Sequence, residues 1–199
     1  ITGTENVPLT GGVLLASNHL SFIDSFCIPL AAPRPVNFLA KSDYFTGAGV
    51  GGAFRRELFT AMGAIPVDRN SASAAQESLD AALEVLRAGG AFGIYPEGTR
   101  SRDGRLYRGR TGVAWLALTA DVPVVPVGLL GTQEMQPVGA SFPRRADVTV
   151  RFGQPIHPGA YSGVAAGKAR RQLTDDVMSA IQELTGQEPA GVYNDVPRA

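Results

Sequence analysis

The sequence predicts an α/β protein, a single layered domain in which helices flank a mostly parallel β-sheet. Short apolar segments alternate along the chain with longer amphipathic segments, and this alternation is typical of strands joined by crossover helices. The length of 199 residues suits one domain. A content of 44 % hydrophobic and only 18 % charged residues supplies a core and excludes a disordered chain.

The N-terminal part of the chain predicts a strand, a helix and a second strand. Residues 12–16 form a continuous apolar run that ends at the polar Ser17, Asn18 and His19, a pattern typical of a buried strand. A helix is expected over 23–30, where two prolines shortly afterwards prevent its continuation. A second strand-like run covers 36–40.

A glycine-rich stretch with several aromatic residues, 44–62, separates these elements from the next strand. No regular periodicity assigns this stretch to a helix or a strand. The short apolar run over 64–67, bounded by Gly63 and Asp68, predicts a third strand.

The clearest helix is predicted over 73–88. Leu79, Leu83 and other apolar residues share one face of this helix, and two glycines follow it as a stop signal. A buried strand over 91–95 comes directly afterwards.

The C-terminal half predicts two helices and two strands after a polar, arginine-rich loop over 97–110. The helices are expected over 111–119 and 165–184, and the strands over 122–130 and 147–152. Two prolines in the strand over 122–130 favour an edge position or an irregular strand over a central one.

The domain organisation follows from these elements. Residues 1–186 are predicted to form the domain. Residues 187–199, which contain two prolines, are expected to be a loosely held tail.

Composition restricts the classes of function. The 18 basic and 18 acidic residues cancel, so the chain has no net charge to attract nucleic acid, and no nucleic acid partner is expected. The lone Cys27 cannot form an internal disulfide, and with only two histidines, His19 and His157, no metal site is expected. These features favour a reducing, cytoplasmic compartment. No run is apolar enough to span a membrane, and because the chain begins at Ile1 rather than Met, a missing N-terminal anchor stays open.

The first candidate site combines His19, at the end of a predicted strand, with Asp24, at the start of a predicted helix. An aspartate that accepts a hydrogen bond from one ring nitrogen leaves the other nitrogen free to act as a base near neutral pH. A lone pair with this spacing is also compatible with a loop histidine and a helix cap.

The second candidate site is the segment Glu97-Gly98-Thr99-Arg100, which opens a basic loop. Between residues 100 and 110 there are five arginines and one acid, Asp103, a local balance of 5 − 1 = +4. Arginine is suited to phosphate, and Gly98 lets the backbone approach closely, so a phosphate-binding site is chemically sensible here. A solvated arginine loop is the alternative.

Together with two weaker blocks, these segments resemble the glycerophospholipid acyltransferase family, specifically the 1-acylglycerol-3-phosphate (lysophosphatidate) acyltransferases. The resemblance extends over roughly Gly3 to Gly153. The matching blocks, in the order of the family, are Asn18, His19 and Asp24; Gly63 to Arg69; Glu97 to Arg100; and Val122 to Gly128. A lone His-x4-Asp pair is common by chance, but the four blocks in this order and register are specific.

The resemblance implies a glycerolipid acyltransferase-like fold and a catalytic role for two residues. On this resemblance, His19 is expected to be the general base that takes the proton from the glycerol hydroxyl, and Asp24 is expected to orient the imidazole and to stabilise its cation. The resemblance further implies that the hydroxyl attacks an acyl thioester and that the product is phosphatidate. No cofactor is implied beyond the co-substrate, which is acyl-CoA or an acyl carrier protein thioester.

The resemblance also implies the residues that bind the acceptor. Arg100, with help from Lys41 and Arg69, is expected to hold its phosphate, and Gly98 and Thr99 belong to the same binding motif. Glu97, a further member of this motif, is expected to organise the arginines rather than to transfer protons.

The partners implied are lysophosphatidate, the acyl thioester and a membrane surface, with acyl carrier protein as a further partner if it carries the donor. Peripheral attachment to the cytoplasmic side of the membrane is expected. The aromatic and basic residues of 44–59 are compatible with an amphipathic patch at the bilayer, and equally with a cover for the sheet.

Other classes are disfavoured by local context. Residues 47–52 match a Gly-x-Gly-x-x-Gly dinucleotide pattern, but they do not follow a strand directly. Two alternatives stay open: a glycerol-3-phosphate acyltransferase, and a non-catalytic module that binds anionic lipid. Substitution of His19 would distinguish an enzyme from a binding module, because a binding module should be nearly unaffected by it.

Overall fold

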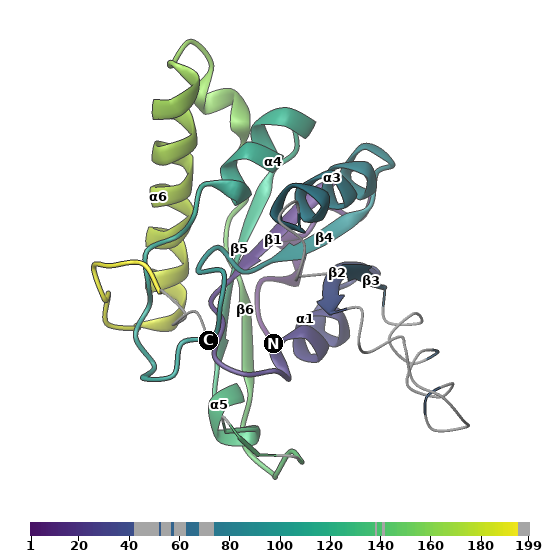
Figure 1. The fold of residues 1–199 in the computed structure, drawn as a ribbon, viewed down its shortest axis with the longest axis vertical. Helices are drawn as coiled ribbons and strands as arrows, with labels where there is room; N and C mark the ends of the chain where they lie inside the picture. The colour runs from purple at the N-terminus through teal and green to yellow at the C-terminus, as the bar shows by residue number, and fades with distance from the viewer. Residues whose placement is uncertain are drawn as a thin grey trace.

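The strands and helices alternate along the chain in the order that the sequence predicts. A computed structural model describes residues 1–41, 63–67, 74–137, 139–140 and 142–194, together with Gly52 and Glu57. The elements, with η for a 3₁₀ helix, are η1 (Thr4–Asn6), β1 (Val13–Ser17), α1 (Asp24–Ala31), β2 (Val36–Lys41), β3 (Ala64–Val67), α3 (Ala74–Arg87), β4 (Ala91–Ile94), α4 (Gly112–Ala120), β5 (Val124–Leu130), α5 (Thr132–Met135), β6 (Thr149–Phe152), η3 (Pro158–Tyr161) and α6 (Ala166–Thr185) (Figure 1).

The described strands form one six-stranded sheet with the order β3-β2-β4-β1-β5-β6. β1 to β5 are parallel to one another, and only β6 is antiparallel to its neighbour, β5. The prediction of a single layered α/β domain with a mostly parallel sheet is therefore confirmed.

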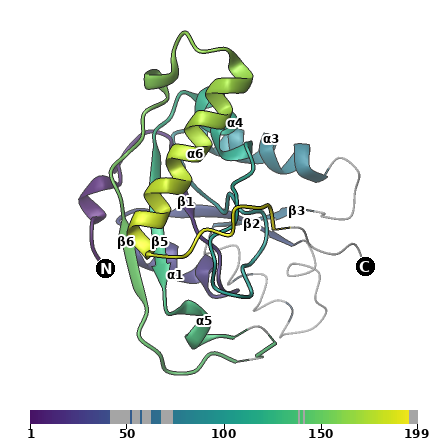
Figure 2. The same ribbon diagram turned by 90° about the vertical axis from the view of Figure 1, so that its left-hand side faces the viewer.

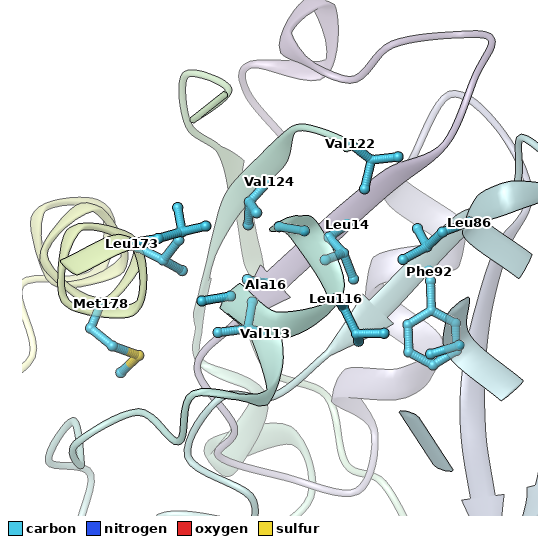
Figure 3. Close-up of a cluster of buried hydrophobic side chains, with 14 of the residues drawn as sticks. Leu14, Ala16, Leu86, Phe92, Val113, Leu116, Val122, Val124, Leu173 and Met178 are labelled. Carbon is cyan, nitrogen blue, oxygen red and sulfur yellow. The ribbon is translucent and has the colours of Figure 1, made fainter. Parts of the chain in front are cut away.

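Helices cover both faces of the sheet, with α3, α4 and α6 on one face and α1 on the other (Figures 1 and 2). On the first face Leu14, Phe92 and Val124, from three neighbouring strands, pack against Leu116 of α4 and Leu173 of α6 (Figure 3). Every residue of β1 is buried, as a strand between two layers of helices requires. β1 is therefore anchored in the core, and the carboxyl end of β1 supports the loop that follows it.

The carboxyl ends of β1 and β4 lie side by side at one edge of the sheet. The two strands are parallel, and their register pairs Ala16 with Ile94. The loop after β1 and the loop after β4 therefore leave the sheet next to each other. These are the loops that carry His19 and Glu97.

Of the two alternatives expected for the strand over 122–130, an edge position and an irregular strand, the edge position is wrong, because β5 lies inside the sheet between β1 and β6. Pro126 is tolerated there because β6 ends at Phe152. The carbonyl of Pro126 accepts a bond from the Gly153 N–H on that side, so its missing N–H faces the irregular chain beyond β6 rather than a regular ladder. The strand also begins later than expected, at Val124.

The expectation of a loosely held tail is wrong for residues 187–194. The N–H and C=O of Leu106 pair with Glu188 and Ala190, and the N–H of Arg108 donates to the Val192 carbonyl at 2.9 Å. Figure 2 shows this yellow segment beside the teal loop that precedes α4. The division of the chain at 186 stays a prediction.

One glycine in β4 makes room for a large aromatic ring. A Cβ at Gly93 would overlap the ring of Phe38, which is buried in β2. We expect Gly93→Ala to lower the free energy of unfolding by about 1–3 kcal/mol through overpacking. Urea unfolding tests this, with Gly159→Ala as a control because open space surrounds Gly159. Equal stability of the two variants would contradict the expected clash.

The segment over 44–59 lies outside the described residues except for Gly52 and Glu57, so its expected role at a bilayer stays a prediction. Among the helices that the structure describes, none combines the length and the apolar composition needed to cross a membrane.

Candidate active site

His19 and Asp24 form a hydrogen-bonded pair at the carboxyl end of β1. Nδ1 of His19 lies 2.8 Å from Oδ2 of Asp24. The aspartate side chain is fully buried, whereas 16 % of the histidine side chain is exposed. The pair therefore combines a carboxylate shielded from water with an imidazole that solvent and substrate can reach.

The local backbone returns Asp24 to the histidine. Asp24 is the first residue of α1, and its Oδ2 also accepts the N–H groups of Leu20 and Ser21, at 2.7 and 2.8 Å. These bonds stabilise the tight turn between β1 and α1, and an acidic residue in the first turn also suits the helix dipole. Oδ1 of Asp24 is buried and has no hydrogen-bond partner in the described structure.

The pairing assigns different roles to the two ring nitrogens of His19. A carboxylate can only accept hydrogen bonds, so in the neutral imidazole Nδ1 carries the hydrogen and donates it to Asp24. The other nitrogen, Nε2, then has a free lone pair. The arrangement is that of a general base held in one tautomer.

Tyr95, the first residue after β4, covers the imidazole. The two rings stack with centroids 3.9 Å apart and planes 9° from parallel. The hydroxyl of Tyr95 lies 3.0 Å from Oγ of Ser25 in α1. Burial, and secondarily the charge of Asp24, raises the pKa of Tyr95 well above its ordinary value of 10.0, so this hydroxyl stays neutral.

Glu97 connects the two loops through their backbones. Its Oε1 accepts the N–H of His19 at 3.0 Å, and its Oε2 accepts the N–H of Tyr107 at 2.9 Å. A third bond runs from the N–H of Ser101 to the carbonyl of His19, at 2.7 Å. The carboxylate thus holds backbone groups, where the sequence predicts that it organises arginines.

The environment of Glu97 disfavours its charge. Burial raises its pKa from 4.5 to about 7, although the two backbone hydrogen bonds act in the opposite direction. Its side chain is fully buried.

Gly98 forms the turn at which the arginine-rich loop begins. Its φ is +80°, a left-handed conformation that favours glycine, and its N–H donates to the Tyr95 carbonyl at 3.0 Å. A Cβ there would lie 3.2 Å from Nε of Arg110. The turn directs the exposed Arg100 away from the core.

The arginines of this loop differ in their surroundings. Arg105 pairs with Asp103 at 2.8 Å, and this bond lowers the pKa of Asp103 to about 2. The guanidinium carbons of Arg108 and Arg110 lie 5.1 and 5.5 Å from the ring centre of Tyr193, on the C-terminal segment. These three arginines are engaged with neighbouring side chains of the protein.

The structure brings together His19, Asp24 and Glu97, and places Gly98, Thr99 and Arg100 on the same loop. Lys41 is the last residue of β2 at the same edge of the sheet, where only its backbone is described. Arg69 lies outside the described residues.

Two amides that complete the site were not assigned a role from the sequence. The Asn18 side chain pairs with both the N–H and the carbonyl of Leu129, at 2.8 and 2.9 Å, and so extends the contact between β1 and β5. It also donates to Gln187 at 2.9 Å, and Gln187 donates to the Gly104 carbonyl at 2.7 Å. Asn18 stands in a matching block, whereas no signal marks Gln187.

Known proteins share this sequence and fold. The family model described as "Acyltransferase" matches residues 1–130. A chloroplastic 1-acyl-sn-glycerol-3-phosphate acyltransferase of Brassica napus is 30 % identical over 179 residues, 89 % of this chain and 50 % of that protein. The enzyme of this name from Bacillus subtilis is 25 % identical over 182 residues, 90 % of this chain and 84 % of that protein.

A solved structure gives a similar result. The crystal structure of the 1-acyl-sn-glycerophosphate (LPA) acyltransferase PlsC from Thermotoga maritima superposes with a TM-score of 0.67 at 26 % identity, covering 92 % of this chain and 70 % of that chain. The chain spans about half the length of the plant relatives that it matches. With a family model that matches 130 of its 199 residues, this chain belongs to the acyltransferase family.

Proposed function

We propose that this protein transfers a fatty acyl chain from an acyl thioester to the free hydroxyl of lysophosphatidate, which gives phosphatidate. The observation that carries the proposal is the His19–Asp24 pair, with a 2.8 Å contact and a partly exposed imidazole, beside the loop that bears Arg100. The names of the relatives support this acceptor.

The proposed reaction moves one proton and one acyl group. Nε2 of His19 takes the hydroxyl proton as the oxygen attacks the thioester carbonyl carbon, and Asp24 stabilises the resulting imidazolium. The C–O bond forms, the C–S bond breaks, and the imidazolium returns its proton to the thiolate. Backbone N–H groups of the glycine-bearing loops are candidates to stabilise the oxyanion.

Binding of the acceptor phosphate is proposed for Arg100, with help from Lys41 and Arg69. The exposed Arg100 follows Gly98 and Thr99 on the loop whose start Glu97 fixes to the His19 backbone. Phosphate held at that loop would place the hydroxyl near the imidazole, and such placement lowers the barrier by converting binding energy into orientation.

The donor and the location are further parts of the proposal. Acyl-CoA and acyl carrier protein thioesters both present the required carbonyl, and no cofactor takes part in the proposed step.

Because the acceptor is an amphiphile, we propose that the protein works at the cytoplasmic surface of a membrane and attaches to it peripherally. Vesicle flotation of wild type and a Phe54→Asp, Phe59→Asp variant tests the segment over 44–59.

A thiol-release assay tests the function. Long-chain acyl-CoA is supplied with lysophosphatidate, with glycerol 3-phosphate and without acceptor, to wild type, His19→Ala and His157→Ala. We expect release that depends on lysophosphatidate, falls by about 10²- to 10⁴-fold in His19→Ala, and persists in His157→Ala. His157 precedes η3 and serves as the matched control.

Comparison of thiol release with the two acceptors and without acceptor distinguishes the alternative functions. Thiol release with glycerol 3-phosphate but not with lysophosphatidate would identify the protein as a glycerol-3-phosphate acyltransferase. A folded protein that releases no thiol with any acceptor, from acyl-CoA or from acyl carrier protein thioesters, would overturn the proposal in favour of a lipid-binding module.

A further inference from the structure

The ring of Tyr95 packs flat against one face of the His19 imidazole. The centroids are 3.9 Å apart and the planes are 9° from parallel. The ring of Phe38 lies next to Tyr95, with a centroid distance of 5.7 Å. Tyr95 is therefore held between the buried β2 side chain and the histidine, and its position is set by the sheet.

The contact with Asp24 alone does not fix the plane of the imidazole. A single hydrogen bond at Nδ1 directs that nitrogen, but it leaves the ring free to tilt about the line between Nδ1 and Oδ2. The stacked ring of Tyr95 removes this freedom, because tilting the imidazole would drive its edge into the tyrosine. The direction of Nε2 is then determined.

The tyrosine hydroxyl ties this arrangement to α1. It lies 3.0 Å from Oγ of Ser25, the residue that follows Asp24 in the first turn of that helix. Asp24 and Tyr95 consequently hold the imidazole from two sides and are both anchored to the same turn. Displacement of α1 would move both together.

We propose that Tyr95 is a positioning residue for the acyl transfer, which aims Nε2 of His19 and stabilises the imidazolium through the face of its ring. This inference rests on the proposed function. An aromatic face attracts a cation, so the stacking strengthens when the imidazole gains a proton. The benefit arises during the reaction and not in substrate binding, so it acts on kcat rather than on KM.

Variants at Tyr95 and Ser25 distinguish the contribution of the tyrosine ring to kcat from that of its hydroxyl. Tyr95→Leu removes the aromatic face, and we expect kcat to fall by about 10- to 100-fold with little change in KM. Tyr95→Phe retains the face, and Ser25→Ala leaves the tyrosine in place. Both are expected to keep kcat within about fivefold, and the double variant is expected to lose no more than either alone.

Nuclear magnetic resonance observes the stacking without any activity measurement. The chain has only two histidines, His19 and His157, so a His157→Asn variant assigns their ring signals. The ring current of Tyr95 shifts the His19 ring protons upfield. We expect this shift to persist in Tyr95→Phe and to vanish in Tyr95→Leu, while the signals of His157 stay unchanged.

A control variant tests for a general effect of losing a tyrosine. Tyr161→Leu removes another hydrogen-bonded tyrosine, whose hydroxyl donates to Asp176 at 2.6 Å, and should leave kcat unchanged. If Tyr95→Leu does not fold, Tyr95→Met replaces it as the variant without an aromatic face.

The outcomes distinguish this inference from the proposed function. A folded wild-type protein without acceptor-dependent thiol release would overturn the function itself. Acceptor-dependent release that survives in His19→Ala would instead overturn the role of His19 as the base, and with it the positioning role of Tyr95. An inactive His19→Ala together with a Tyr95→Leu variant of wild-type kcat would overturn the positioning role alone. An equal loss of kcat in Tyr95→Phe and Tyr95→Leu would do the same, because the ring face would then contribute nothing.

Discussion

Asp24→Asn is expected to lower kcat by about 10²- to 10³-fold in a protein that still folds. The asparagine oxygen can occupy the place of Oδ2 and accept the same three donors, from His19, Leu20 and Ser21. The amide NH₂ then takes the place of Oδ1, which is buried without a partner. The geometry survives, but the negative charge that stabilises the imidazolium is lost.

A double variant tests whether Asp24 acts only through the histidine. Residues that act as one unit lose their effects non-additively, so His19→Ala with Asp24→Asn should be no slower than His19→Ala alone. The measurement is steady-state thiol release, with urea unfolding to confirm the fold. A double variant much slower than His19→Ala would show that Asp24 has a second role.

The pH dependence of stability is expected to report on Glu97. Its pKa is about 7 in the folded protein and ordinarily 4.5, so between these values the folded state keeps a proton that the unfolded state releases. The free energy of unfolding should therefore fall as the pH rises through this window, by on the order of 3 kcal/mol in total. Below pH 4.5 this loss is absent, and above pH 7 it is complete.

Glu97→Gln isolates this contribution. In this variant the NH₂ of the glutamine replaces one carboxyl oxygen and cannot accept the backbone N–H of His19 or of Tyr107 that faces it. At pH 5 its free energy of unfolding should therefore be lower than that of wild type by about 1–3 kcal/mol. The difference should shrink by pH 8, because only the wild type loses stability as its carboxyl ionises.

Urea unfolding between pH 4.5 and 8 measures both curves. Glu183→Gln, on the exposed side of α6, is the control and should follow the wild type at every pH. If the difference in the free energy of unfolding between wild type and Glu97→Gln stayed constant or grew with pH, burial would not be the dominant effect on the pKa of Glu97.

The sequence predicts the sheet well because strands buried on both sides have a simple signature. The run over 12–16 is apolar at every position, as expected for a strand between two layers of helices, and β1 covers most of it. The short α5 and η3 were not expected, since helices of four residues have no periodicity to detect. The sequence does not decide whether β5 lies at an edge, because a proline such as Pro126 is tolerated both at an edge and beside a neighbouring strand that ends early.

The site was predictable where the contacting residues are close in sequence, and it was unpredictable where the contact joins distant segments or involves the backbone. His19 and Asp24 are close in sequence, and their chemistry suggests the pair. Glu97 binds the N–H groups of His19 and Tyr107, which every residue type except proline offers, so nothing in the sequence names its partners. The stack of Tyr95 on the histidine depends likewise on the register of β1 and β4.

The hydrogen bond between Asn18 and Gln187 has a consequence for the order of folding. It joins residues 169 positions apart, and Gln187 follows the residue that caps the end of α6. Closing so long a loop is entropically unfavourable until the intervening chain is in place, so this contact belongs to the late events of folding. A chain in which the sheet has formed but α6 has not docked has its strands, but it lacks the bond from Gln187 to the Gly104 carbonyl that helps to hold the arginine-rich loop. Heating that first releases α6 should therefore abolish catalysis before the sheet melts.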